Sequence, residues 1–221
     1  MIFTRPGVAW HGPAWHGPAG QGKARKQQRR REKMIDRIEL EIEGVSPLLM
    51  HNGEMADPLN PMTQELKKVS SKRVKTESDH REMAKLEWHA GIYQQEGVVV
   101  VPGVMLDKTI IEAARKSRKG KQVQSGVMVD GDPALEFPDK GKSLTALYES
   151  GSYTDRRMVV VQKNRIARTR PKFNVWSLQF SIQFDDELVS RSELVDMVDL
   201  AGQTIGIGDY RPRFGRFQRL V

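Results

Sequence analysis

The 221-residue sequence contains no cysteine, and this absence excludes several classes of protein at once. A disulfide scaffold, a cysteine–zinc site, an iron–sulfur cluster and a thiol nucleophile all require cysteine. Long apolar runs are also missing, since none approaches the roughly 20 residues that span a bilayer. The first residues lack the apolar centre of a signal peptide. We therefore expect a soluble, cytoplasmic protein without membrane contact.

Acidic residues are scarce in one part of the chain only. The formal net charge is +8, from 36 Lys+Arg and 28 Asp+Glu. Residues 1–33 contain eight basic residues and a single acid, Glu32, so this segment alone carries +7. The rest of the chain is nearly balanced, with 28 basic and 27 acidic residues. The net charge therefore says little about what the folded part binds. For that part, the local placement of charge indicates the binding partner.

The same segment, residues 1–33, is low in complexity. The pentapeptide Ala-Trp-His-Gly-Pro starts at Ala9 and repeats from Ala14, and glycine, glutamine and basic residues follow. This composition predicts a disordered basic tail. Its cations suit phosphates, and Trp10 and Trp15 can stack on bases. An alternative stays open, in which the repeat is translated repetitive DNA and the protein starts at Met34.

From residue 34 onward the pattern is typical of a globular domain. Apolar and polar side chains alternate in two segments, which predicts strands with one buried face. Without its insertions the chain reads as a split β-α-β repeat, which predicts an α+β, ferredoxin-like fold of the RRM type with an antiparallel sheet. The expected halves are strand 35–43, helix 104–116 and strand 157–161, then strand 176–184, helix 191–201 and strand 214–220.

We expect one domain over 34–221, interrupted by an insertion at about 52–97. Within this insertion, residues 62–80 hold four lysines and an arginine, and both a helix and a mobile segment are compatible with them. With both helices on one face of the sheet, the other face is free for a ligand. RNA-binding domains of this plan hold nucleic acid there.

A cation-rich β-hairpin is predicted between residues 156 and 170. Because alternate residues of a strand share a face, Arg168 and Arg170 lie together and can follow a phosphate chain. The alternative is a solvated hairpin whose charges guard an edge against aggregation. Seven cations without an acid exceed that need, which favours binding. The candidate nucleic-acid contacts here are Arg156, Arg157, Lys163, Arg165, Arg168, Arg170 and Lys172.

Two further groups of cations are candidates for phosphate contacts. The segment 208–217 mixes glycine, arginine and aromatic residues, which suits close approach, phosphate binding and base stacking. A glycine-rich turn into a strand with core phenylalanines is the structural alternative. The second group follows the helix expected at 104–116. The candidates are Arg211, Arg213 and Arg216 in the first group and Lys116, Arg118 and Lys119 in the second.

Catalytic motifs are few. The sequence contains neither His-Glu-x-x-His nor the Gly-x-x-x-x-Gly-Lys-[Ser/Thr] phosphate loop. His51, Glu54 and Asp57 lie close together in one loop, where carboxylates could bind a divalent cation that activates water. A polar loop of turn-forming residues is the simpler interpretation. We assign no catalytic residue, metal or cofactor, and keep Asp57 and His51 as weak candidates only.

Three segments, in the same order along the chain, resemble the repeat-associated RNA-binding (RAMP) superfamily. Val100-Val101-Pro102-Gly103-Val104-Met105-Leu106 is similar to that family's Ile-Pro-Gly-x-x-Leu-(Lys/Arg)-Gly entry to its first helix. Ala201-Gly202-x-x-Ile205-Gly206-Ile207-Gly208, followed by Phe214-Gly215-Arg216-Phe217, resembles its glycine-rich loop and last strand. Ile38-Glu39-Leu40-Glu41-Ile42 with Pro47-Leu48 fits its first strand.

The resemblance implies the properties of RAMP proteins, which are backbone and processing subunits of CRISPR effector complexes. These properties are RNA binding, and assembly with further copies or with related subunits. The sequence departs from the family at Asp107-Lys108-Thr109, where a basic residue and glycine are usual. Asp57 lies where some members carry a catalytic aspartate. A stand-alone relative in a phage or mobile element fits the small size, and implies the cytoplasm of a bacterial host or phage-infected cell.

The sequence thus favours a non-catalytic protein that binds RNA or single-stranded DNA mainly through the phosphate backbone. It would be a self-assembling subunit of a ribonucleoprotein, a homo-oligomer or one of several related subunits. Two alternatives belong to other classes. One is a metal-dependent endoribonuclease that uses Asp57, and the other is a phage structural or assembly protein that does not bind nucleic acid.

Overall fold

The computed structural model describes residues 35–161 and 163–220, and an antiparallel sheet forms its centre. Strands are hydrogen-bonded in the order β10-β1-β9-β5, and β6 also pairs with β9. The long central strands are β1 (Ile35–Gly44) and β9 (Ser177–Asp185), paired so that Leu40 lies opposite Phe180. Ile38, Leu40 and Ile42 are buried while Glu39 and Glu41 are exposed, as their alternation predicts.

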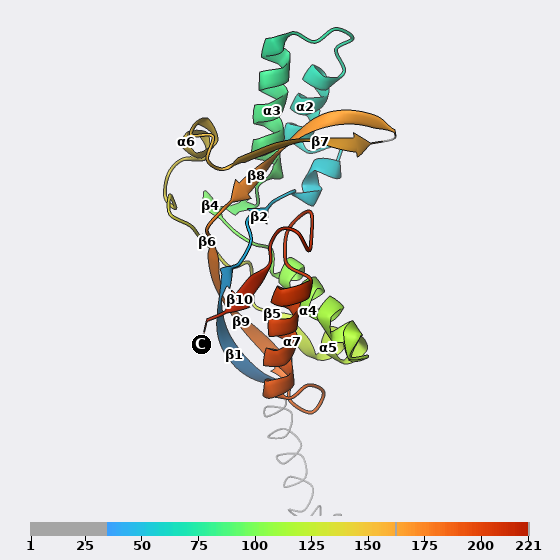
Figure 1. Cartoon of the computed structure of the whole chain (residues 1–221), viewed down its shortest axis with the longest axis vertical. Coiled ribbons are helices and arrows are strands. Elements are labelled where there is room, and N and C mark those ends of the chain that lie inside the picture. Colours follow the sequence, from blue (N-terminus) through green and yellow to red (C-terminus); the bar gives the residue numbers. More distant parts are fainter. Residues whose placement is uncertain (1–34, 162, 221) are drawn as a thin grey trace, which may run out of the picture.

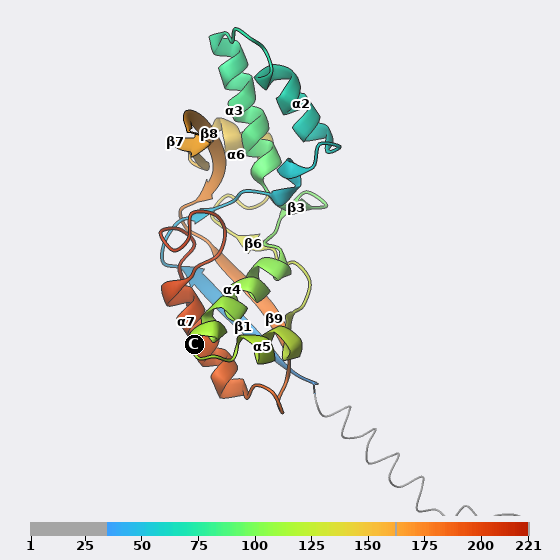
Figure 2. The same cartoon turned by 90° about the vertical axis from the view of Figure 1, so that its right-hand side faces the viewer.

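Two helices cover one face of this sheet, α4 (Gly103–Lys116) and α7 (Arg191–Thr204). Figure 2 shows both, with α5 (Gly120–Gly126), on the same side of β1 and β9. Ser190 caps α7 in a capping box with Glu193, as the sequence indicates. The order β1-α4-β5-β9-α7-β10 is a split β-α-β repeat, so the predicted α+β, ferredoxin-like class is confirmed.

The second strand of the first half was predicted wrongly. It is β5 (Val127–Val129), not residues 157–161. Those residues belong to β7 (Thr154–Val161), which pairs with β8 (Asn164–Phe173) in a separate hairpin. The apolar run of β7 looks like a core strand in the sequence, yet Met158 is 62% exposed and Val160 is 69% exposed. The sequence does indicate a short strand at Val127–Val129, but with three residues among turns it has a weaker pattern than the longer apolar run at 158–161, which was assigned to the sheet in its place.

A second part of the molecule extends from the sheet (Figure 1). It contains the hairpin β7–β8 and two helices, α2 (Pro61–Ser70) and α3 (Glu77–Gly91), within the segment predicted as an insertion. Helix α3 packs on β8 and on α2. Its Trp88 is fully buried and donates a hydrogen bond of 2.8 Å from Nε1 to the carbonyl of Tyr153. The lysine-rich residues 62–80 are therefore mainly helical and attached to the hairpin.

The remaining elements are short. They are β2 (Leu48–Leu49), η1 (Gly53–Ala56), β3 (Gln94–Gln95), β4 (Val98–Val99), β6 (Leu135–Glu136), α6 (Leu144–Glu149) and β10 (Phe217–Arg219). Strand β2 pairs with β8 and so connects the hairpin to the body. Among the described residues, no helix has the length and apolar character needed to cross a membrane. The predicted tail, residues 1–33, lies outside the described part.

Candidate nucleic-acid interface

The face of the sheet that the helices leave free is acidic. Glu39, Glu41 and Glu43 of β1 point to it, opposite polar residues of β9. Glu39 accepts a hydrogen bond from Ser181 and Glu43 accepts one from Gln218, each at 2.5 Å. The aromatic residues of the described strands of this sheet are buried on the helix side. The carboxylates on this face repel phosphate, and the described strands place no aromatic ring there on which a base could stack. RRM-type binding of nucleic acid on the open sheet is therefore not favoured.

Three of the seven hairpin cations are engaged inside the protein. Arg157 forms a two-point ion pair with Asp155, and its guanidinium lies 5.2 Å from the ring centre of Tyr210 and 4.8 Å from that of Phe214. The carboxylate of Asp155 raises the pKa of Arg157. Arg170 is only 9% exposed, with Nε 2.7 Å from a carboxylate oxygen of Asp209. These arginines hold the hairpin to the C-terminal loop and are not free for phosphates.

The third engaged cation, Arg168, connects the hairpin to α3. Its Nη1 lies 2.5 Å from Oε1 of Glu87, while Oε2 of Glu87 accepts a hydrogen bond of 2.9 Å from the backbone N–H of Thr169. Glu87 is 3% exposed. Arg168 and Arg170 do lie on one face, as the spacing predicts, but carboxylates from elsewhere in the chain neutralise both. The absence of acids between residues 156 and 172 could not reveal these partners.

Of the remaining four cations, Lys172 is half-buried where β8 pairs with β2, and the other three are exposed. Arg156 and Arg165 make no ion pair with any residue that the structure describes, and Lys163 is exposed at the turn. In the register of the hairpin, Arg156 lies opposite Thr169, Met158 opposite Ala167 and Val160 opposite Arg165. Paired residues share a face, so exposed Met158 lies between the two arginines and exposed Val160 lies directly opposite Arg165. This face of the hairpin combines apolar surface with unpaired positive charge.

A groove of about 950 Å³ runs between this hairpin and the helices α2 and α3. Figure 2 shows α3 beside the hairpin and α2 packed on the far side of α3. Two carboxylates line the groove, and each is paired: Glu77 with Arg81, and Glu87 with Arg168. The groove therefore has an excess of positive charge. Its cations are Lys67, Lys75 and Arg81 from the helical side and Arg156, Arg165 and Arg168 from the hairpin.

The candidates named from the sequence do not include Lys67, Lys75 and Arg81, which line the groove on its helical side. The signal was the lysine-rich composition of residues 62–80, yet composition alone cannot show that α2 and α3 fold against the hairpin. Lys75 donates a hydrogen bond of 2.8 Å to the carbonyl of Lys72, and Lys67 makes no ion pair within the described residues. Lys67 of α2 and Lys75 of the connection to α3 thus add positive charge to the wall of the groove that faces the hairpin.

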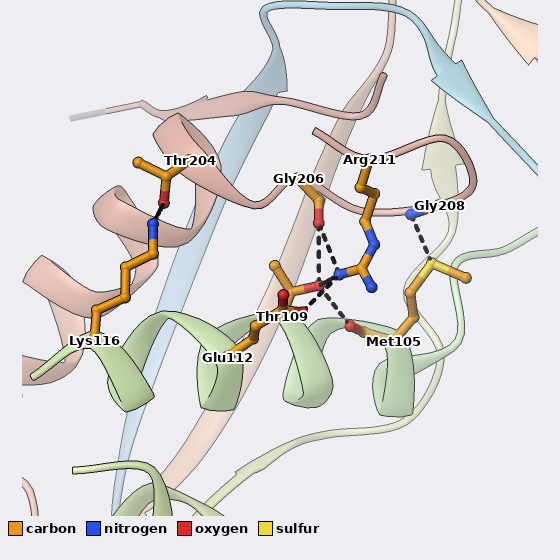
Figure 3. A network of polar contacts seen from close by, with 8 residues as sticks. All are labelled: Met105, Thr109, Glu112, Lys116, Thr204, Gly206, Gly208 and Arg211. Atoms are coloured by element: carbon orange, nitrogen blue, oxygen red, sulfur yellow. Dashed lines mark hydrogen bonds and ion pairs between the residues drawn. The ribbon is translucent and has the colours of Figure 1, made fainter. Parts of the chain in front are cut away.

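The C-terminal glycine-rich loop is fixed on α4 (Figure 3). Nη1 of Arg211 lies 3.3 Å from a carboxylate oxygen of Glu112 and 3.4 Å from the carbonyl oxygen of Gly206. Thr109 donates a 2.9 Å hydrogen bond to the carbonyl of Met105. Arg211 is therefore engaged within the protein. Arg213 and Arg216 are exposed and make no ion pair with a described residue.

The glycines of this loop serve the loop's own packing. A Cβ atom at Gly208 would lie 2.3 Å from the carbonyl oxygen of Leu49, and one at Gly215 would lie 1.7 Å from that of Ile207. Both residues have positive φ, at 80° and 71°. The sequence suggested that these glycines let the backbone approach a ligand, but in the structure they approach the protein's own backbone.

The cations after α4 lie at the opposite end of the molecule from the groove (Figures 1 and 2). Lys116 donates a 2.8 Å hydrogen bond to Thr204, as Figure 3 shows. Lys119 forms an ion pair with Glu193, and this contact lowers the pKa of Glu193 to about 2. Arg118 is exposed. The predicted contacts therefore do not form one continuous surface.

The loop with His51, Glu54 and Asp57 does not assemble a metal centre. Oδ1 of Asp57 accepts a hydrogen bond of 2.9 Å from the N–H of Leu59, which closes a turn. Burial lowers the pKa of His51, and the nearby Arg170 lowers it further. Among the described residues, no three His, Cys, Asp or Glu side chains come together as ligands. The hydrogen bond that Asp57 accepts from Leu59 is the contact expected of a turn-forming residue in a polar loop.

Comparison with solved structures shows a likeness in fold. No protein-family model matches the chain, and no curated protein does. A solved structure titled "Crystal structure of Cmr6 from Pyrococcus furiosus" is similar to this chain, with a TM-score of 0.37 and 8% sequence identity. The match covers 84% of this chain and 99% of that one. A TM-score this low carries no weight for function, which has to come from this chain's own residues.

Proposed function

We propose that this protein binds nucleic acid, RNA or single-stranded DNA, without catalysis and mainly through the phosphate backbone. The observation that carries the proposal is the groove between the β7–β8 hairpin and the helices α2–α3. Six cations line it, and both of its carboxylates are already paired within the protein. Such an excess of cations attracts phosphates and releases the counterions bound to them.

The sequence resemblance to RAMP proteins supports RNA as the ligand. Assembly into a ribonucleoprotein with further copies or related subunits rests on that resemblance alone and stays a prediction. The acidic open face of the sheet directs the nucleic acid toward the groove, because Glu39, Glu41 and Glu43 repel phosphate. We assign phosphate contacts to Arg156 and Arg165, because both are exposed and make no ion pair with a described residue.

The salt dependence of binding tests the proposal. Fluorescence anisotropy with labelled RNA and DNA strands of one sequence gives the affinity of the full chain between about 50 and 200 mM salt. Each phosphate contact on a single strand adds about 0.7 to the slope of log K against log salt. We expect R156Q/R165Q to reduce this slope by about 1.4.

The matched control is R115Q/K121Q, which removes the same charge from exposed positions at the other end of the molecule. It leaves the groove intact, so the slope should match that of the unchanged protein. Equal losses in the two variants would mean that net charge alone drives binding. Absence of binding by the unchanged protein, or binding that ignores salt, would refute the proposed function.

A further inference from the structure

The groove has a second wall, formed by helices from a distant part of the sequence. Resting on the function proposed above, we infer that α2 and α3 contact the same strand as the hairpin, and that the groove selects a single strand whose bases lie on its apolar floor. The proposal assigns a binding role to Lys67 and Lys75, which the sequence motifs do not single out. It also assigns a role to apolar residues, which binding through phosphates alone does not need.

The two walls are held at a fixed separation. Glu87 on α3 pairs with Arg168 and also accepts from the N–H of Thr169, so one buried carboxylate joins the helix to β8 at two points. Trp88, the next residue of α3, donates to the carbonyl of Tyr153 just before β7. Both contacts connect the helical wall to the base of the hairpin. A ligand therefore meets a groove whose walls are already in place, and less ordering is needed on binding.

Cations stand on both walls. Lys67 lies in the last turn of α2 and Lys75 in the connection to α3, across the groove from Arg156 and Arg165. Arg81 is paired only with Glu77, and this exposed pair is worth little. A phosphate can take the place of such a carboxylate at small cost. A nucleic-acid strand in the groove is thus contacted by positive charge from two sides, whereas the hairpin alone would provide charge on one side only.

The surface between these cations is apolar. From the hairpin, Met158 lies between Arg156 and Arg165, and Met158 is 62% exposed. The lining residues that make up this apolar floor are Leu66, Met83, Ala84, Met158, Ile166 and Ala167. Unpaired bases can pack on apolar side chains, whereas a duplex keeps its base faces stacked inside. The combination of floor and cations therefore favours a single strand over a duplex.

An acidic peptide is the other polyanion that such cations attract. It carries no flat rings to cover the apolar floor, so its binding would depend on charge alone. The floor is what favours nucleic acid. The two occupants differ in one measurable respect, namely whether removal of the bases weakens binding.

The test combines two variants with four probes, with the full chain at fixed salt. The helical-wall variant is K67Q/K75Q, and R115Q/K121Q is the charge-matched control. The probes are a single strand of about 12 nucleotides, the same strand without bases, the corresponding duplex, and poly-glutamate as a competitor. Thermal melting checks that each variant remains folded.

We expect K67Q/K75Q to weaken single-strand binding about tenfold, through the loss of two phosphate contacts, while the control stays within about twofold. The unchanged protein should bind the base-free strand and the duplex about tenfold more weakly than the single strand. Poly-glutamate should compete poorly.

Each result that contradicts the inference differs from failure of the proposed function. If the unchanged protein binds no nucleic acid, the proposed function itself fails. If it binds, but K67Q/K75Q behaves like the control, the helices do not contact the bound strand. If base-free strand, duplex or poly-glutamate bind as well as the single strand, the apolar floor has no role in recognition.

Discussion

At the scale of single residues, the polar groups that look like ligand contacts in the sequence are often contacts within the protein. Arg170 lies against Asp209, and Arg211 lies against Glu112 and the carbonyl of Gly206. A sequence shows charge but not the partner that folding brings to it. The residues that remain free, such as Arg156 and Arg165, differ from these only in their surroundings.

Gly215 gives a test at this scale. A Cβ atom there would lie 1.7 Å from the carbonyl oxygen of Ile207, and φ is 71°. Gly215→Ala should lower the free energy of unfolding by about 3 kcal/mol or more, from backbone strain and the clash together. Urea denaturation followed by circular dichroism measures it.

The control for Gly215→Ala is Gly151→Ala. Gly151 has the same φ of 71°, but a Cβ atom there would meet nothing within 4 Å. Its substitution should cost only the strain of the left-handed backbone, about 1 kcal/mol. The difference between the two variants therefore isolates the close packing of the loop. Equal costs would show that the loop does not need this approach.

At the scale of elements, most of the ferredoxin-like unit could be predicted from the sequence. Long strands such as β1 and β9 can be predicted from their alternation of apolar and polar residues. A serine ahead of Glu193 indicates the N-cap of α7, which the structure places at Ser190. The three residues of β5 can be read as a short strand, but their pattern is too short to assign them to the sheet. The hairpin was predicted, but its place was not, because an apolar run does not show whether it faces a core or solvent.

Only one of the two walls of the candidate groove could be predicted from the sequence. The hairpin wall of the groove follows from local sequence, whereas the helical wall depends on packing between segments far apart in the chain. Glu87 illustrates the limit, since nothing around it in the sequence indicates that it binds β8. Long-range contacts of this kind place α2 and α3 beside the hairpin, and a single sequence carries no direct signal for them.

Glu87 gives a test of how these elements are joined. Glu87→Gln keeps the shape of the side chain but removes its charge, leaving Arg168 without its carboxylate. We expect the free energy of unfolding to fall by about 2 kcal/mol, since the carboxylate is buried and accepts two hydrogen bonds. Arg168 itself is partly exposed, and solvent screening limits the loss.

Glu77→Gln is the matched control for Glu87→Gln, because Glu77 lies on the same helix and also pairs with an arginine. Its side chain is 80% exposed, so the change should stay within about 0.5 kcal/mol. Urea denaturation of the two variants side by side makes the comparison. Equal losses would contradict a special role for Glu87 in holding α3 against the hairpin.

At the scale of the whole molecule, charge is divided among separate regions. The groove lies at one end, the cations after α4 lie at the other, and the acidic face of the sheet lies in the body between (Figures 1 and 2). A chain that binds nucleic acid through its groove should therefore show contact at one end only. A general polyelectrolyte attraction would instead involve both basic ends.

Hydrogen exchange of the full chain, with and without a saturating single strand, distinguishes these two cases. Peptides that cover α2, the start of α3 and the β7–β8 hairpin should exchange more slowly with the strand present, because bound ligand suppresses local opening. Peptides that cover residues 116–126 and the acidic strand β1 should be unchanged. Protection at 116–126 equal to that at the hairpin would place the nucleic acid on both ends. Protection of β1 would return it to the open sheet, and either result would remove the groove as the specific site.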